Sequence, residues 1–197
     1  MKLFKVKLLV VTALMFAASS AFGSYGMDFN VNTSSLNGQS GYLELQLNPG
    51  PVLGAANALV SNYSSDAALL VGAPALTGDV SGALPASVTL NNTAPWNDYF
   101  QQVTFGNTLN FHLDLGGAAG NTFALSFYGA DGLTSLLSSD PSGFATLVGL
   151  NDSSVSVNNL SSAVTVTDAA PTPVPAAAWL LGSGLMGLVG MRRRKQA

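Results

Sequence analysis

The sequence predicts an all-β domain, an antiparallel β-sandwich or jelly roll, over residues 24–168. Three observations point to it. Short apolar runs alternate with polar residues at the period of a half-buried strand. Residues typical of turns separate these runs at spacings of about 8 to 15 residues. No stretch between residues 23 and 168 has a helical period of useful length. Many short strands without intervening helices are typical of two antiparallel sheets packed face to face.

The alternation is clearest in three stretches, residues 42–47, 110–115 and 123–127, where every second residue is Leu or Phe. These apolar residues are expected to face the core, and they are Leu43, Leu45, Leu47, Phe111, Leu113, Leu115, Phe123, Leu125 and Phe127. Weaker strands are expected at residues 27–31, 58–63, 88–90, 100–105, 145–150, 155–157 and 163–167. Turns are expected at residues 37–38, 48–51, 77–79, 116–117, 130–132 and 140–143.

The chain has 197 residues, and the part between its terminal segments is long enough for one domain with a hydrophobic core. It contains no cysteine. No disulfide therefore stabilises the fold, and cysteine usage gives no information on the redox compartment. Stability is expected to come from the hydrophobic core.

Charge is distributed unevenly along the chain. The seven basic residues lie only at the two ends and are Lys2, Lys5, Lys7, Arg192, Arg193, Arg194 and Lys195. The ten carboxylates all lie between them. Such an acidic domain repels nucleic acid and anionic surfaces. It also lacks the cationic clamps used in acyl or phosphoryl transfer, and we expect no internal salt bridge.

Residues 1–21 are predicted to be a secretory signal peptide. Three lysines precede an apolar stretch at residues 8–18, and the small residues Ser19, Ser20 and Ala21 follow it as a cleavage site, with residues 21–23 as a second candidate. The apolar stretch is too short to span a bilayer, which takes about 20 residues. The sequence therefore predicts export through the inner membrane.

The C-terminal end has three parts: a Pro-rich linker at residues 169–175, an uncharged apolar segment at 176–191, and a basic tail at 192–195. A helix over residues 176–191 is about 24 Å long, slightly short of the bilayer core of about 30 Å, so we expect it to span the membrane only marginally. Trp179 is expected to lie at the outer interface, and the basic tail on the cytoplasmic side. A single transmembrane helix is therefore predicted here.

This tail, residues 171–195, resembles the PEP-CTERM sorting signal of Gram-negative bacteria that produce exopolysaccharide. The residues that carry the resemblance are Pro173, Val174, Pro175, Ala176, Ala177, Ala178, Trp179, Arg192, Arg193 and Arg194. Val174 stands where the motif that names the family has glutamate, so the processing position stays open. An ordinary tail anchor that remains in the membrane is the alternative.

The resemblance implies that an exosortase, a membrane-embedded transpeptidase, recognises the tail. The chain is then anchored transiently in the inner membrane and is later found at the cell surface or outside the cell. Residues 29–42, 90–93 and 96–100 also resemble one subgroup of PEP-CTERM proteins. That likeness implies a shared architecture and brings no ligand and no catalytic residue.

Trp96, Tyr99 and Phe100 form an aromatic group with Asn97 and Asp98 between them. Exposed aromatic rings flanked by Asn and Asp are typical of sugar-stacking sites, whereas buried rings belong to a core. Trp96 and Tyr99 are therefore candidate carbohydrate contacts.

His112 and Asp114 are expected to share the outward face of one strand. A metal there needs further carboxylates from elsewhere, so a solvent-facing histidine is the preferred interpretation. The chain has no Asp-x-Asp-x-Asp loop and no Gly-x-Ser-x-Gly motif. We predict no catalytic residue, metal or cofactor, although calcium between loops stays open.

Three functions are consistent with these features. The first is a non-enzymatic structural protein of the envelope or the exopolysaccharide matrix of a biofilm. The second is a carbohydrate-binding module that acts on that exopolysaccharide. The third is a secreted hydrolase that uses two carboxylates, which meet only in the folded chain.

Overall fold

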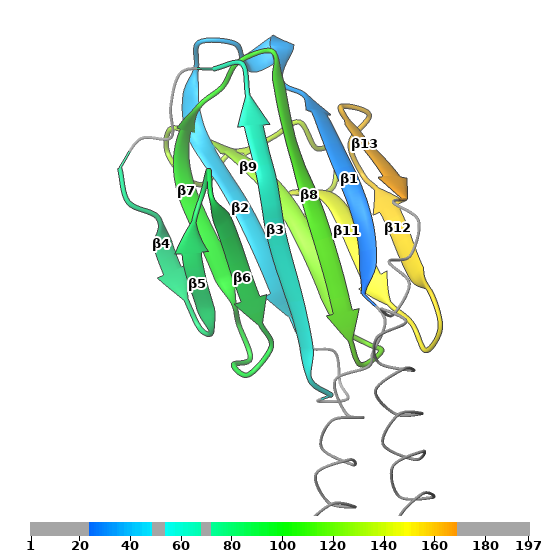
Figure 1. Cartoon of the computed structure of the whole chain (residues 1–197). Helices are drawn as coiled ribbons and strands as arrows, with labels where there is room; N and C mark the ends of the chain where they lie inside the picture. The colour runs from blue at the N-terminus through cyan, green and yellow to red at the C-terminus, as the bar shows by residue number, and fades with distance from the viewer. Residues whose placement is uncertain (1–23, 49–53, 68–71, 169–197) are drawn as a thin grey trace, which may run out of the picture. The chain divides into compact units, whose positions relative to one another are not determined.

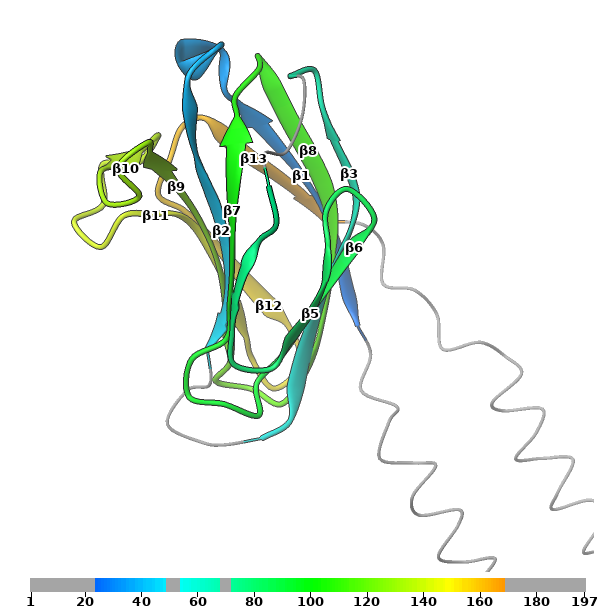
Figure 2. The same cartoon turned by 90° about the vertical axis from the view of Figure 1, so that its left-hand side faces the viewer.

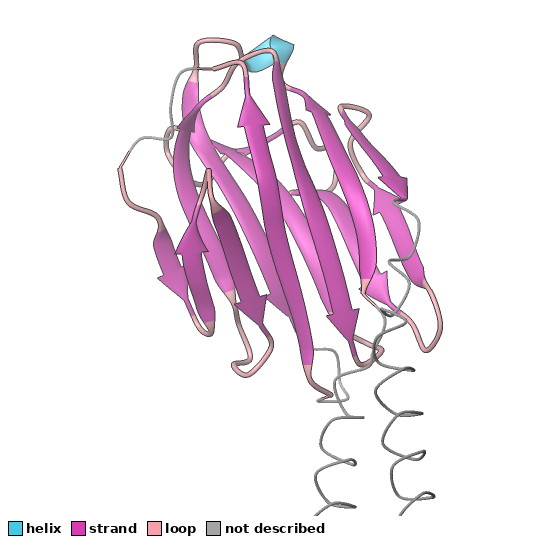
Figure 3. Cartoon of the chain, in the orientation of Figure 1, coloured by secondary structure: helices cyan, strands magenta, loops and turns pink. Residues whose placement is uncertain are grey.

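The computed structural model describes residues 24–48, 54–67 and 72–168, and this part of the chain is all-β (Figures 1 and 3). Residues Ser24–Pro171 form a compact unit of their own. The segments predicted as signal peptide, linker and sorting signal, at 1–21 and 169–195, lie outside the described residues. Within those residues, no helix is both long and apolar enough to cross a bilayer.

Two antiparallel sheets make up the described fold. Sheet A has the order β13-β1-β8-β3-β6-β5, with β1 Tyr25–Asn32, β3 Ala56–Ser65, β5 Val80–Ala83, β6 Ser87–Asn91, β8 Thr108–Gly117 and β13 Val164–Asp168. Sheet B has the order β12-β11-β9-β2-β7-β4, with β2 Ser40–Asn48, β4 Ala75–Thr77, β7 Asp98–Thr104, β9 Thr122–Gly129, β11 Phe144–Leu150 and β12 Val155–Asn159. Strand β10, Ser135–Leu136, pairs with β9, and a 3-10 turn, η1, covers Ser34–Leu36.

Early and late strands pair with one another in nested order. Strand β1 pairs with β8, β2 with β7, and β3 with β6. The chain therefore passes from one sheet to the other between β1, β2 and β3, and the two sheets lie face to face as two layers (Figure 2). Strand β8 is central in sheet A, and β2 lies between β7 and β9 in sheet B.

The hydrophobic core lies between the two sheets. The nine Leu and Phe residues expected to face inward are all buried, each with at most 3% of its surface exposed. Phe29 of β1 stacks on Phe111 of β8, with ring centroids 4.6 Å apart. Phe29 also forms a T-shaped contact with Phe123 of sheet B, with ring centroids 6.1 Å apart, and this contact links the two layers. Burial of this kind contributes about 25 cal/mol per Å² of apolar surface.

Each stretch predicted as a strand lies in or overlaps a strand of the structure. The short strands β4, β5 and β10 were not predicted, since β4 and β5 are mostly exposed and show no apolar alternation. The turn expected at residues 116–117 is wrong, because both glycines end β8. Gly117 has a φ of +121°, and a Cβ there would clash with Ala55 and Ala56 where β3 approaches.

Replacing Leu113 with alanine tests the central position of β8. Leu113 is 0% exposed, so Leu113→Ala is expected to lower the free energy of unfolding by about 2–5 kcal/mol through lost burial and a cavity. Val157→Ala, at a side chain 37% exposed, is the control and should change it by less than about 0.5 kcal/mol. Urea denaturation measures both, and equal small losses would contradict this core.

Candidate functional site

The outer face of sheet B gathers aromatic rings and carboxylates from three neighbouring strands. In β7, Tyr99 and Gln101 face the core, while Asp98 and Phe100 face outward because side chains alternate along a strand. Cross-strand pairing places Glu44 of β2 opposite Phe100 of β7, and Ser126 of β9 opposite Glu44. We call Tyr42, Glu44, Asp98, Phe100 and Tyr128 the outer-face cluster.

Three part-exposed aromatic rings form one side of this cluster. The rings of Tyr42 and Phe100 are stacked, with centroids 4.5 Å apart and planes at 14°. Tyr128 lies beside Phe100 at 6.0 Å. The loop from β9 to β10 packs on them at Gly132, where a Cβ would lie 3.7 Å from Tyr42 and 3.8 Å from Phe100. The rings are therefore held together from three strands.

The two carboxylates beside the rings are almost fully buried, with Glu44 8% and Asp98 9% exposed. The Tyr128 hydroxyl donates a hydrogen bond to Glu44 Oε2 at 3.1 Å. Burial, the charge of Glu44 and a hydrogen bond with Glu44 raise the pKa of Asp98 to about 7. Two carboxylates in contact cannot both ionise freely, so the pair shares a proton near neutral pH.

Two buried oxygens at this site lack a hydrogen-bond partner. Among the described residues, Asp98 Oδ1 and Ser126 Oγ are the buried side-chain atoms in this condition. Ser126 is 1% exposed and lies directly across from Glu44. Buried polar atoms are nearly always paired, so these two oxygens require a hydrogen-bond partner, which a water molecule or a polar ligand can supply.

The structure separates the two predicted carbohydrate contacts. Trp96 is 51% exposed in the loop before β7 and remains available to a ligand. Tyr99 is 0% exposed, and its hydroxyl accepts from the Leu84 N–H at 3.1 Å and donates to Gln101 Oε1 at 3.2 Å. The prediction that Tyr99 contacts carbohydrate is therefore wrong, because the residue lies on the inward side of β7.

His112 faces outward on sheet A, as expected, and lies near Asp114 with Nε2 3.6 Å from Oδ1. Its closer partner is Asp28 of β1, with Nδ1 2.6 Å from Oδ1. A protonated His112 therefore forms an ion pair, and the expectation of no internal salt bridge is wrong for that state. No three His, Cys, Asp or Glu side chains in the described ranges are arranged to hold a metal ion.

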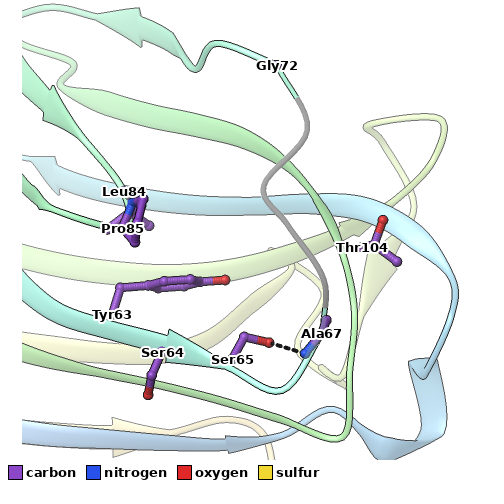
Figure 4. Close-up of a pocket in the computed structure, with 8 residues that line it drawn as sticks. All are labelled: Tyr63, Ser64, Ser65, Ala67, Gly72, Leu84, Pro85 and Thr104. Atoms are coloured by element: carbon purple, nitrogen blue, oxygen red, sulfur yellow. Dashed lines mark hydrogen bonds between the residues drawn. The ribbon is translucent and has the colours of Figure 1, made fainter.

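A pocket of about 440 Å³ opens elsewhere, beside the end of β3 (Figure 4). Its lining residues are Tyr63, Ser64, Ser65, Ala67, Gly72, Leu84, Pro85 and Thr104. A β-bulge between Ser61 and Ser64, with Asn62 at a φ of 54°, turns Tyr63 toward it. Burial and then the neighbouring Tyr99 raise the pKa of Tyr63 to about 12, so this phenol stays neutral at physiological pH. The lining residues that the structure describes include hydroxyls and no carboxylate.

Comparison of the chain with protein-family models, curated proteins and solved structures gave no match. Among the described residues, Asp98 is the carboxyl group whose pKa is raised, and it lies in the outer-face cluster. Groups with perturbed pKa values are enriched at functional sites. The outer-face cluster, which joins this group to aromatic rings, is therefore the candidate functional site.

The geometry of the carboxylate pair does not suit glycoside hydrolysis. A retaining glycosidase holds its two carboxyl groups about 5 Å apart and an inverting one about 6.5–9.5 Å apart, so that sugar or water fits between them. Asp98 and Glu44 are hydrogen-bonded to each other, which is closer than either of these arrangements. The pair can accept hydrogen bonds or hold a positive charge.

The raised pKa of Asp98 predicts how stability changes with pH. Its pKa rises from an ordinary value of 3.8 to about 7 on folding, so the stability it contributes is fully present below about pH 3.8. That stability is lost as the pH rises through 7. The free energy of unfolding of the wild type, minus that of Asp98→Asn, should fall between pH 4 and about 7.5 and then level off.

Urea denaturation at each pH measures this difference. Asp66, Asp79 and Asp131 have lowered pKa values, from hydrogen bonds to Thr108, Thr93 and Thr134 respectively, and contribute the opposite slope at lower pH. Their contributions cancel because both proteins contain them. A difference that stays constant across the range would contradict the raised pKa.

Proposed function

We propose that this chain is an exported, non-enzymatic protein of the cell envelope or exopolysaccharide matrix, and that its sandwich binds carbohydrate through the outer-face cluster. The observation that carries the binding proposal is the meeting of the stacked Tyr42 and Phe100 rings with the buried Glu44–Asp98 pair on one sheet face. Carbohydrate binding is then the means by which the domain stays in the matrix.

The chemistry of the cluster suits a sugar ring. Aromatic faces are electron-rich and attract the polarised C–H groups on the apolar face of a pyranose. Asp98 Oδ1 and Ser126 Oγ are unpaired acceptors, to which sugar hydroxyls can donate. Trp96, two residues before Asp98 in the sequence, is 51% exposed and offers a further ring to a ligand.

The terminal segments support the proposal of export and sorting. Residues 1–21 have the pattern of a signal peptide, and residues 171–195 resemble an exosortase sorting signal with Pro173, Val174 and Pro175 before Ala176. The transmembrane helix proposed at residues 176–191 would hold the chain in the inner membrane until the exosortase acts. The fold is further proposed to be a jelly roll, because β1/β8, β2/β7 and β3/β6 pair in nested order.

Replacement of Phe100 tests carbohydrate binding. The full-length protein, purified in a nonionic polyoxyethylene detergent, is screened on a glycan array, and bound glycans are titrated by calorimetry. Phe100→Ala removes the central ring of the cluster and should weaken binding about tenfold. Trp96→Ala should weaken it less, and Val157→Ala, at a 37% exposed side chain on β12, should leave it unchanged. Equal affinities in Phe100→Ala and the wild type would exclude this site.

The mass of the mature protein tests sorting separately. In cells that contain an exosortase, the protein should lose residues 179–197, and in cells without the enzyme it should keep them. Replacing Arg192, Arg193 and Arg194 with alanine should also prevent the loss, because the basic tail orients the segment in the membrane. Recovery of the intact tail from exosortase-containing cells would show an ordinary anchor instead.

A further inference from the structure

The electrostatic surroundings of the outer-face cluster restrict the ligands that it can accept. No lysine or arginine lies between residues 7 and 192, whereas all ten carboxylates do. His112, the only histidine in the sequence, is on the outer face of the other sheet and pairs with Asp28. A ligand that approaches Glu44 and Asp98 therefore meets negative charge that no nearby cation of the domain offsets.

We propose that the glycan bound at this site carries protonated amino groups, and that one ammonium group binds against the carboxyl groups of Glu44 and Asp98, beside the rings of Tyr42, Phe100 and Tyr128. This proposal rests on the carbohydrate binding proposed above. The expected ligand is an amino-sugar polymer with free amines, and uronic-acid polymers are not expected to bind.

An ammonium group matches the atoms available at the site. It donates three hydrogen bonds, and Asp98 Oδ1 and Ser126 Oγ are buried acceptors that lack a donor. The Glu44 carboxylate lies between them and accepts from the Tyr128 hydroxyl. The aromatic rings of the cluster add the quadrupole attraction that such rings have for a cation.

A metal ion fits the same atoms less well. Calcium takes six to eight oxygen ligands, most of them hard carboxylate or carbonyl oxygens. The cluster offers two carboxylates, and no group of three or more metal-ligating side chains occurs in the described residues. Aromatic rings on one side further favour an organic cation over a hydrated ion.

An ammonium group that binds here would displace the proton that the carboxylate pair shares. As the ligand enters, the proton on Asp98 leaves to solvent, and the positive charge of the ammonium replaces it. The titratable groups that face Asp98 are Glu44 of β2 and Tyr128 of β9, and its partner on β4, Thr77, has no charge. Burial and the two carboxylates raise the pKa of Tyr128, so it stays neutral.

Two sugar hexamers that differ only in amine acetylation test the proposal. The full-length protein is titrated by calorimetry with glucosamine hexamer and with N-acetylglucosamine hexamer at pH 6.5, each with and without EDTA. The glucosamine hexamer should bind about tenfold more tightly. Glu44→Gln and Asp98→Asn should each reduce that ratio toward one. Asp152→Asn, which removes the same charge at an exposed position, should leave the ratio unchanged.

The outcomes distinguish amine recognition from carbohydrate binding in general. Equal binding of the two hexamers would overturn amine recognition and leave carbohydrate binding in place. Binding of no array glycan would overturn both. An equal fall in the ratio for Asp152→Asn would show general attraction to an acidic domain, and a preference abolished by EDTA would show a bridging metal. Either result contradicts an ammonium site at Glu44 and Asp98.

Discussion

The fold depends on burial of one face of each sheet against the other. The chain has no cysteine for a disulfide, and no lysine or arginine between residues 7 and 192 for an ion pair. Apolar contacts between the layers must therefore supply the stabilisation that such links provide in other exported domains. The contacts of Phe29 with Phe111 in its own sheet and with Phe123 in the other show how tightly the layers meet.

The same constraint determines which side chains face outward. Side chains alternate along a strand, so fixing Tyr99 and Gln101 in the core of β7 fixes Asp98 and Phe100 on the outer face. A shift of one residue in register would exchange the two sets. The inward packing of β2 in turn places Glu44 beside Asp98. The outer-face cluster is thus a geometric consequence of the core.

The sequence was sufficient to predict most strands, because their apolar residues alternate over several positions. It was not sufficient for β4 and β5, which lie at sheet edges and bury little. Trp96 and Tyr99 were selected for their aromatic character, yet whether each ring is exposed or buried depends on tertiary packing. The alternation of Asp98 and Phe100 with Tyr99 was visible in the sequence and is the signal that could have identified the outward pair.

The partners of that pair could not be predicted, because they come from distant strands. Glu44 lies opposite both Phe100 and Ser126, and only the pairing of β2 with β7 and β9 brings them together. Asp28 reaches His112 in the same way, across β1 and β8. Local patterns determine the faces of a strand, whereas a site assembled across strands also requires their order.

The carboxylates on the outer faces of the two sheets have different neighbours. On sheet A, Asp28 and Asp114 flank His112, a group that can become positive. On sheet B, Glu44 and Asp98 are in contact, nearly buried, and have no basic side chain from the described residues beside them. Burying like charges is costly, and departures from local rules of this kind concentrate at functional sites. Because the described residues supply no cation to this pair, only a shared proton or the ligand proposed above can offset its negative charge.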